Sequence, residues 1–279
     1  MDVLVTGAYG RCGTALIDHL HDHEDYEFTY YNRSDRPDDH PYGGYDTIVG
    51  NVTEGAKLQA ASEGRDAMVH MAANPSTGAE WGSVLEANIV GTYNALEAAR
   101  REELETFVFL STNHVVGQYE SEHAPELYEP GYGLVVDHES PVRPDSFYGA
   151  SKSFGEDLGR YYVERHEYPK QFYALRTGTV NSAEYDHPYG NAESGVDDGN
   201  YERGSDAYER AVARLKCTWQ SRRDFAHQVE CCLRDDNVDH GIFYGVSDNQ
   251  HRWFDLEHGR SVIDYNPQDD GAEWDAPPE

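Results

Sequence analysis

The sequence predicts an α/β fold in which helices cover both faces of a doubly wound parallel sheet. Two observations predict it. Short apolar runs alternate with helical patterns through the first half of the 279-residue chain, which is typical of βαβ units. A glycine-rich turn also lies directly between the first apolar run and the first helical pattern, which is the usual start of such a fold.

Short apolar runs predict the strands, and stretches with apolar residues at helical spacing predict the helices. The expected strands cover residues 3–6, 28–31, 47–49, 67–71, 106–110, 172–175 and 241–246. The expected helices cover residues 11–21, 83–101, 146–165, 206–216 and 223–233. Residues 181–205 are rich in Gly, Asp, Asn, Glu and Tyr with little periodicity, which predicts a long surface excursion or a lid.

The chain is expected to contain two regions. Residues 1–177 should form the dinucleotide-binding region and carry the catalytic residues. Residues 178–279 should form a small substrate-binding region that ends in an acidic tail. We expect the second region to interleave with the first rather than to fold independently.

The chain is strongly acidic. Asp and Glu number 52 against 22 Lys and Arg, which gives a formal net charge of −30. Such a surface repels nucleic acid and anionic membranes, so neither is an expected partner. It is typical of a protein from a salt-loaded cytoplasm, where salt screens the repulsion between like charges. Acidic disorder is disfavoured because 12% of the residues are aromatic and the apolar runs are compact.

Other features predict a cytoplasmic protein without a membrane anchor or a metal. The cysteines have neither CxxC spacing nor a zinc pattern, so we expect reduced thiols at Cys12, Cys217, Cys231 and Cys232. The first residues have neither the basic nor the apolar region of a signal peptide, and no run approaches the roughly 18 apolar residues that span a bilayer, so we expect neither secretion nor membrane insertion. Alternating histidines at the end of the first helix predict a solvated helix end; they are His19, His21 and His23.

A glycine-rich motif opens the first predicted helix. Residues 6–13 read Thr-Gly-Ala-Tyr-Gly-Arg-Cys-Gly. In the Rossmann fold, glycines at such a turn let the backbone approach a pyrophosphate, which the NH groups of the helix N-terminus then hold. We therefore expect cofactor contacts from Gly7, Tyr9, Gly10, Arg11, Cys12 and Gly13.

The end of the second strand bears on the choice of cofactor. NAD enzymes usually place an acid there for the ribose hydroxyls, whereas an Arg accommodates the 2′-phosphate of NADP. Here the strand runs into Asn32, Arg33 and Ser34, without an acid at the expected place. The sequence favours NADP. NAD is the alternative if Arg33 is merely solvated and Asn32 holds the ribose.

Two later strand ends should also contact the cofactor. The third predicted strand is followed by Asn51 and Val52, at the place where such folds hold the adenine. The fourth strand ends at His70 and continues into the expected path of the nicotinamide, at Met71, Ala72 and Ala73. We expect His70 to be structural rather than catalytic.

A tyrosine and a lysine four residues apart form the candidate catalytic pair. Tyr148 and Lys152 fall on one face of the helix predicted for 146–165. A positive Lys152 stabilises the phenolate of Tyr148, so that Tyr148 can take the proton of a substrate hydroxyl. The strand at 106–110 ends in hydroxyl groups, and Thr112 can hydrogen-bond the reacting oxygen.

Taken in order, these motifs resemble the extended short-chain dehydrogenase/reductase superfamily, the epimerase/dehydratase-like group, over essentially residues 1–265. The resemblance implies that Thr112 is the catalytic hydroxyl, Tyr148 the base and Lys152 the supporting cation. It implies that Asn88 holds a proton-relay water. It also implies that Asn88, Tyr148 and Lys152 contact the cofactor.

Within the superfamily the chain looks similar to uronate dehydrogenases and, more closely, to haloarchaeal dehydrogenases of arabinose or glucose 6-phosphate. The resemblance lies in Ser-Thr-Asn-His-Val-Val-Gly at 111–117, Arg-Pro-Asp-Ser-Phe-Tyr-Gly at 143–149, Phe-Gly-Glu-Asp at 154–157 and Tyr-Gly-Val-Ser-Asp-Asn at 244–249. It implies sugar contacts from Ser76, Thr112, Asn113, His114 and Tyr148. A hydrogen-bonded histidine at a strand end is the alternative for His114.

The same resemblance singles out one arginine. The carboxylate-binding Arg of uronate dehydrogenases precedes a Thr-Trp-x-Ser stretch, and residues 218–221 here read Thr-Trp-Gln-Ser, which makes Arg214 the match. Two interpretations stay open. Arg214 and Lys216 either clamp a carboxylate or phosphate, or are solvated charges on a helix.

The implied reaction is oxidation of a sugar at its anomeric carbon. Hydride leaves C1 for the nicotinamide, Tyr148 takes the hydroxyl proton, and a lactone forms. L-arabinose or a similar pentose or hexose is the favoured substrate, with glucose 6-phosphate or a uronate as the alternative. A homodimer through the helices at 83–101 and 146–165 is compatible with apolar residues at Leu85, Ile89, Phe154 and Leu158.

Other functions are disfavoured to different degrees. Nucleotide-sugar epimerase stays open as a further alternative. A dehydratase is disfavoured because Asn113 and His114 stand where those enzymes carry an acidic pair. A cofactor-sensing protein without catalysis is disfavoured because Tyr148 and Lys152 are both present.

Overall fold

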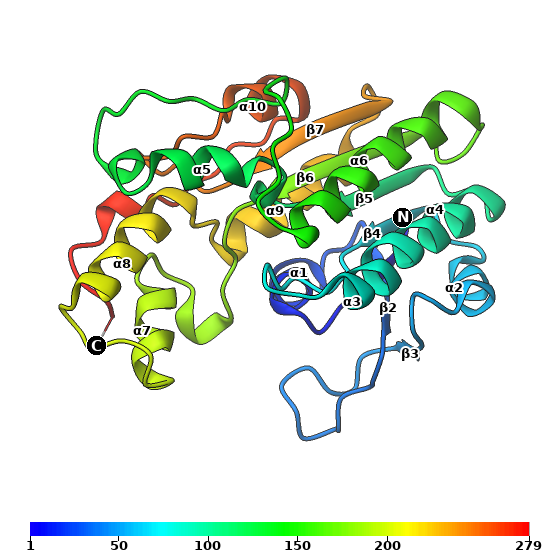
Figure 1. The fold of residues 1–279 in the computed structure, drawn as a ribbon. Coiled ribbons are helices and arrows are strands. Elements are labelled where there is room, and N and C mark those ends of the chain that lie inside the picture. The colour runs from blue at the N-terminus through cyan, green and yellow to red at the C-terminus, as the bar shows by residue number, and fades with distance from the viewer. Residues whose placement is uncertain (279) are drawn as a thin grey trace.

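A parallel seven-stranded sheet forms the centre of the computed structural model, which describes residues 1–278 (Figure 1). The strand order is β3-β2-β1-β4-β5-β6-β7, and every neighbouring pair is parallel. The strands are β1 (Asp2–Thr6), β2 (Glu27–Asn32), β3 (Thr47–Val49), β4 (Ala67–His70), β5 (Thr106–Leu110), β6 (Gln171–Thr177) and β7 (His240–Gly245). The predicted α/β class with a parallel sheet is confirmed.

Alternating side chains of the strands build two hydrophobic layers. In β1, Val3 and Val5 belong to one layer and Leu4 to the other, because successive side chains point to opposite faces. The first layer is covered by α1 (Arg11–Leu20) and α9 (Arg222–Arg234). The second is covered by α2 (Gly55–Ser62), α4 (Gly91–Arg101) and α6 (Phe147–Arg165), of which α4 and α6 cross the near face in Figure 1.

The helix predicted for 83–101 is divided into three parts. It consists of α3 (Trp81–Val84), a π-helical segment η1 (Leu85–Val90) and α4. The helix predicted for 146–165 is almost unchanged as α6, since Ser146 caps it by accepting a hydrogen bond from the Gly149 NH at 3.1 Å. The remaining helical elements are α5 (Gly117–His123), α7 (Gly190–Asp197), α8 (Asp206–Thr218), α10 (Glu257–Ile263), and the short 3₁₀ turns η2 (Asn113–Val116), η3 (Glu126–Tyr128), η4 (Ala183–Tyr185) and η5 (Gly271–Glu273).

The excursion at 181–205 contains regular structure that the sequence did not predict. Its main element is α7, whose glycines and asparagine are poor helix formers. Tertiary contacts stabilise α7 instead, because Ala192 packs in a small apolar cluster with Tyr208 and Val212 of α8. Glu193 also accepts a hydrogen bond from the Tyr208 hydroxyl at 2.5 Å.

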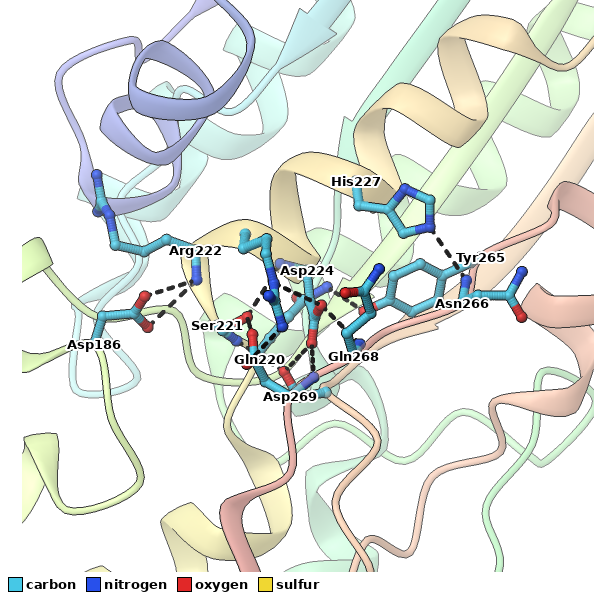
Figure 2. A network of polar contacts seen from close by, with 12 residues as sticks. Asp186, Gln220, Ser221, Arg222, Asp224, His227, Tyr265, Asn266, Gln268 and Asp269 are labelled. Atoms are coloured by element: carbon cyan, nitrogen blue, oxygen red, sulfur yellow. Dashed lines mark hydrogen bonds and ion pairs between the residues drawn. The ribbon is translucent and has the colours of Figure 1, made fainter. Parts of the chain in front are cut away.

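The expected acidic tail is not a loose extension, because buried polar contacts fix it to the body (Figure 2). The Asp224 carboxylate accepts hydrogen bonds from the Ser247 hydroxyl at 2.6 Å and from the Gln268 and Asp269 NH groups at 2.9 and 3.1 Å. Tyr265 is fully buried and donates to the Val246 carbonyl at 2.9 Å.

One arginine links the second half of the chain to the glycine-rich loop. Arg222, at the start of α9, is buried and donates to the carbonyls of Arg11 at 3.1 Å and Asn181 at 3.2 Å. It also forms an ion pair with Asp18 of α1. Within residues 1–278, no helix is both long and apolar enough to cross a membrane.

Candidate active site

A cavity of about 1330 Å³ opens where the carboxyl ends of the strands meet. Gly7 follows β1, Met71 follows β4, and Ser111 follows β5, so parallel strands bring these distant residues to one edge. With the exceptions of Asn88 and Lys216, every residue that the sequence predicted for cofactor or substrate lines this cavity. The structure therefore brings the predicted site together.

The glycine-rich loop forms the floor of the cavity. Gly7 has a φ of 73°, and a Cβ there would stand 2.7 Å from the Ala72 nitrogen. A Cβ at Gly13 would stand 2.2 Å from the Ala8 carbonyl oxygen, so only glycine lets α1 approach the loop this closely. The first turn of α1 has no side-chain cap, which leaves its NH groups free to bind a pyrophosphate. The loop therefore fits a dinucleotide.

The end of β2 presents positive charge to the cavity. Arg33 and Arg36 both line it, whereas Glu86 of η1 is the only carboxylate among its described lining residues. The Arg36 guanidinium lies over the Tyr9 ring, 5.1 Å from its centroid. Arg36 is a site residue that sequence reasoning missed, because it lies in an irregular loop where neither periodicity nor a motif marks it.

The candidate catalytic pair lies on the first turns of α6. Tyr148 and Lys152 are both buried, and the Lys152 ammonium donates to the Leu110 carbonyl at the end of β5 at 2.6 Å. Gly149 lets α6 reach this place, because a Cβ there would stand 2.3 Å from the His114 carbonyl oxygen. The helix and the strand end thus hold the phenol and the ammonium at the cavity wall.

Burial shifts both groups of the candidate pair toward their neutral forms. It lowers the pKa of Lys152 to about 7 and raises the pKa of Tyr148 to about 12, although a hydrogen bond from Thr112 acts in the opposite direction on Tyr148. Tyr148 therefore stays protonated at neutral pH unless further positive charge is placed beside it.

His70 lies outside the candidate catalytic pair. It is fully buried, and its Nδ1 lies 2.8 Å from the Thr6 hydroxyl. Burial lowers the pKa of His70 to about 3, so the ring is neutral at physiological pH. The position agrees with a structural histidine beneath the cavity.

His114 both lines the cavity and hydrogen-bonds within the protein. Its Nδ1 lies 2.6 Å from a carboxylate oxygen of Asp145, and Asp145 accepts a second hydrogen bond from the Ser146 hydroxyl at 2.8 Å. Asp145 therefore fixes the orientation of the ring. Asp145 lies in the motif at 143–149, but no local pattern marks its role, because its contact with His114 spans 31 positions.

Asn88 is one of two predicted residues that do not line the cavity. Its side chain is buried, accepts from the Asn74 NH at 2.7 Å and donates to the Ser151 hydroxyl at 2.9 Å. Ser151 in turn donates to the Tyr148 carbonyl at 2.7 Å. The Asn88 side chain is thus linked through Ser151 to the backbone of Tyr148 in α6.

Arg214 and Lys216 do not form a joint clamp. Arg214 lines the cavity from α8, but its guanidinium is paired with Glu120 of α5. Lys216 does not line the cavity, and its ammonium donates to the Trp274 carbonyl at 2.7 Å, so the structure does not bring it beside Arg214 at the site. Asn191 of α7 also lines the cavity and was missed, because it lies in the excursion that showed no periodicity.

Neither a disulfide nor a metal cluster contributes to the site as described. The four cysteines are free thiols, and burial raises the pKa of the Cys12 thiol in the glycine-rich loop to about 12. Over residues 1–278, no group of three or more His, Cys, Asp or Glu is arranged to hold a metal ion.

Comparison with known proteins gives a family match over most of the chain. The model of the NAD dependent epimerase/dehydratase family matches residues 3–229. Two relatives from Haloferax volcanii are each 34% identical. One, an NAD-dependent glucose-6-phosphate dehydrogenase, is matched over 98% of this chain and 95% of its own length. The other, an L-arabinose 1-dehydrogenase (NAD(P)(+)), is matched over 97% of both chains.

A solved structure shows the same architecture. The crystal structure of a glucuronic acid dehydrogenase from Chromohalobacter salexigens superposes with a TM-score of 0.73 at 26% identity. The superposition covers 98% of this chain and 86% of that one.

Proposed function

Because the chain belongs to the NAD dependent epimerase/dehydratase family, we propose that it is an NAD(P)-dependent sugar 1-dehydrogenase. It oxidises the anomeric hydroxyl of an aldose to the lactone. The observation that carries this proposal is the meeting of Thr112, Tyr148 and Lys152 at one wall of the cavity whose floor is the glycine-rich loop. Family membership also confirms the resemblance that the motifs indicated.

The mechanism divides the work among these residues. A nicotinamide cofactor held by the glycine-rich loop and by Met71, Ala72 and Ala73 would supply the hydride acceptor for C1 and a positive charge near Tyr148. Tyr148 takes the proton of the anomeric hydroxyl, which Thr112 orients, so that the carbon–oxygen double bond of the lactone forms as the C1–H bond breaks. Lys152 stabilises the phenolate by its charge, and His114, held by Asp145, orients the sugar.

The experiment is a reduction assay in molar KCl with NADP or NAD and a panel of neutral and anionic aldoses. Absorbance of the reduced cofactor should grow with at least one sugar. Tyr148→Phe should fold and bind cofactor yet lose roughly 100-fold or more in turnover, because general base catalysis is worth about that much. Tyr161→Phe is the matched control, since Tyr161 lies exposed on the same helix.

Two outcomes would contradict the proposal. Turnover of Tyr148→Phe at the level of the Tyr161→Phe control would remove the base from the mechanism. Conversion of a nucleotide sugar without net cofactor reduction would favour an epimerase instead.

Of the two cofactors, NADP suits the site better. Arg33 and Arg36 line the cavity at the end of β2, and Asn32 stands where an acid would bind the ribose hydroxyls of NAD. Two guanidinium groups without a neighbouring lining carboxylate can bind a 2′-phosphate.

We also propose a cytoplasmic location and a homodimer. A cytoplasmic location suits the free thiols and the acidic composition. A homodimer through η1 and α6 suits the large apolar side chains that these elements expose, among them Leu85, Phe147 and Phe154. A light-scattering mass of one chain in molar KCl would contradict the dimer.

A further inference from the structure

Arg214, which lines the part of the cavity where the sugar should bind, is already paired within the protein. Arg214 donates through Nε to Glu120 Oε1 at 2.6 Å and through Nη2 to Oε2 at 3.0 Å. The Tyr128 hydroxyl donates to the same Oε1 at 2.7 Å. Glu120 is only 13% exposed, so three hydrogen bonds and its surroundings hold the carboxylate in place. One edge of the guanidinium is therefore occupied.

The other charged groups near Arg214 do not restore a positive site. Asp145 is close enough to raise the pKa of Arg214 together with Glu120, and His114 is bonded to Asp145. The Lys152 ammonium is bound to the Leu110 carbonyl at 2.6 Å. The remaining polar groups that line this end are uncharged and include Asn113, Thr179 and Asn191.

We propose that Glu120 sets the substrate class of this site by neutralising Arg214, so that the enzyme takes a neutral aldose and discriminates against uronates and sugar phosphates. The inference rests on the proposed sugar 1-dehydrogenase function. Arg214 then acts as a fixed hydrogen-bond donor: its free edge, which includes Nη1, faces a sugar hydroxyl while Glu120 holds the other edge.

Simple electrostatics supports this preference for a neutral sugar over an anionic one. A neutral hydroxyl accepts a hydrogen bond from the free edge of Arg214 at no charge penalty. An anionic group at the same place would gain only that edge and would be repelled by Glu120 and Asp145. The pair is partly buried, so salt screens this repulsion less than it would at the surface.

The test compares two sugars that differ only at C6, galactose and galacturonate. Glu120→Gln removes the charge but keeps the size and the acceptor oxygen of the side chain. Glu122→Gln is the matched control, because Glu122 lies on the same helix but is 48% exposed and paired with Arg143 at the surface. The quantity measured is the ratio of kcat/KM for galacturonate to kcat/KM for galactose, which does not depend on the folded fraction of each preparation.

We expect the wild-type enzyme to favour galactose. In Glu120→Gln the ratio should rise on the order of tenfold toward galacturonate, as a close charge pair at a binding site can supply. In Glu122→Gln it should stay at the wild-type value.

In the competing role, Glu120 binds Arg214 only until the carboxylate of an incoming substrate displaces it. This role predicts a wild-type enzyme that prefers galacturonate or glucose 6-phosphate, and that result would overturn the inference while leaving the dehydrogenase function intact. An unchanged ratio in Glu120→Gln would overturn it as well. If Glu120→Gln does not fold, the wild-type ratio alone decides. Cofactor reduction with none of the sugars would instead overturn the proposed function and the inference with it.

Discussion

At the scale of single residues, the site depends on a lysine that burial makes hard to charge. Burial lowers the pKa of Lys152 from 10.5 to about 7. Between these values the unfolded chain binds a proton that the folded chain releases. The contribution of Lys152 to stability therefore rises with pH across this window. The cost of burying a charge at the catalytic centre is greatest below neutral pH.

This cost can be measured with Lys152→Met. The unfolding free energy of wild type minus that of the variant should grow by at least about 1 kcal/mol as the pH rises from about 6 to about 9. Denaturant titrations at constant KCl and without cofactor measure the difference. Lys170→Met is the control, because Lys170 is exposed and paired with Glu105. A difference between Lys152→Met and wild type that does not change with pH would contradict the buried charge.

The cofactor preference is also a matter of single residues. Arg33→Ala should lower kcat/KM with NADP by about tenfold or more and leave kcat/KM with NAD nearly unchanged, since only NADP carries the 2′-phosphate. Arg160→Ala, a surface arginine of α6 paired with Glu164, serves as the control. Equal losses with both cofactors would show that Arg33 does not contact this phosphate.

Residues of the site were predictable where a local pattern carries the chemistry. The glycine-rich loop and the Tyr148–Lys152 spacing are such patterns, and both reach the cavity. Glu120 was not predictable, because its contact with Arg214 joins residues 94 positions apart. Nothing in the neighbourhood of either residue encodes that pairing, which exists only after α5 and α8 have packed.

At the scale of elements, capped and periodic helices were predictable and those made by tertiary packing were not. Ser146 and Ser221 cap α6 and α9, and both helices begin within a residue or two of the expected place. By contrast, α7 contains poor helix formers and depends on burial of Ala192 against α8. The attachment of the acidic tail was not predictable, because its binding partner, Asp224, is 44 positions from Gln268.

The tail contact gives an element-scale prediction. Asp224→Ala should lower the unfolding free energy by about 3 kcal/mol, because several buried donors lose their acceptor at once. Hydrogen exchange of the Gln268 and Asp269 amides should become faster. Asp248→Ala is the control: Asp248 is 42% exposed, and its surface ion pairs are worth about 1 kcal/mol or less. Equal destabilisation by both variants would contradict the buried anchor.

At the scale of the whole molecule, the net charge of −30 sets the conditions under which the fold persists. Like charges over the surface repel one another, and the Debye length falls from about 10 Å at 0.1 M salt to about 3 Å at 1 M. The Tm should therefore rise by at least about 5 °C over this range, which corresponds to about 2 kcal/mol for a domain of this size. Calorimetry in KCl and in NaCl measures it, and a Tm that stays constant or falls would contradict electrostatic self-repulsion.

The division into two regions also belongs to this scale. We propose that residues 178–279 do not fold independently, because β7 adds to the sheet beside β6 and α9 covers the layer that α1 begins. Excision of either region would expose one edge of the sheet and the apolar side of α1.

The packing of α9 on α1 has a consequence for the order of events during synthesis. Leu16 and Ile17 of α1 share a hydrophobic layer with Phe225 and Val229 of α9. The ion pair between Asp18 and Arg222 spans 204 positions. A ribosome that adds roughly 5–20 residues per second delivers α9 about 10–40 seconds after α1. During that time the apolar side of α1 is exposed on the nascent chain, where chaperones can bind it.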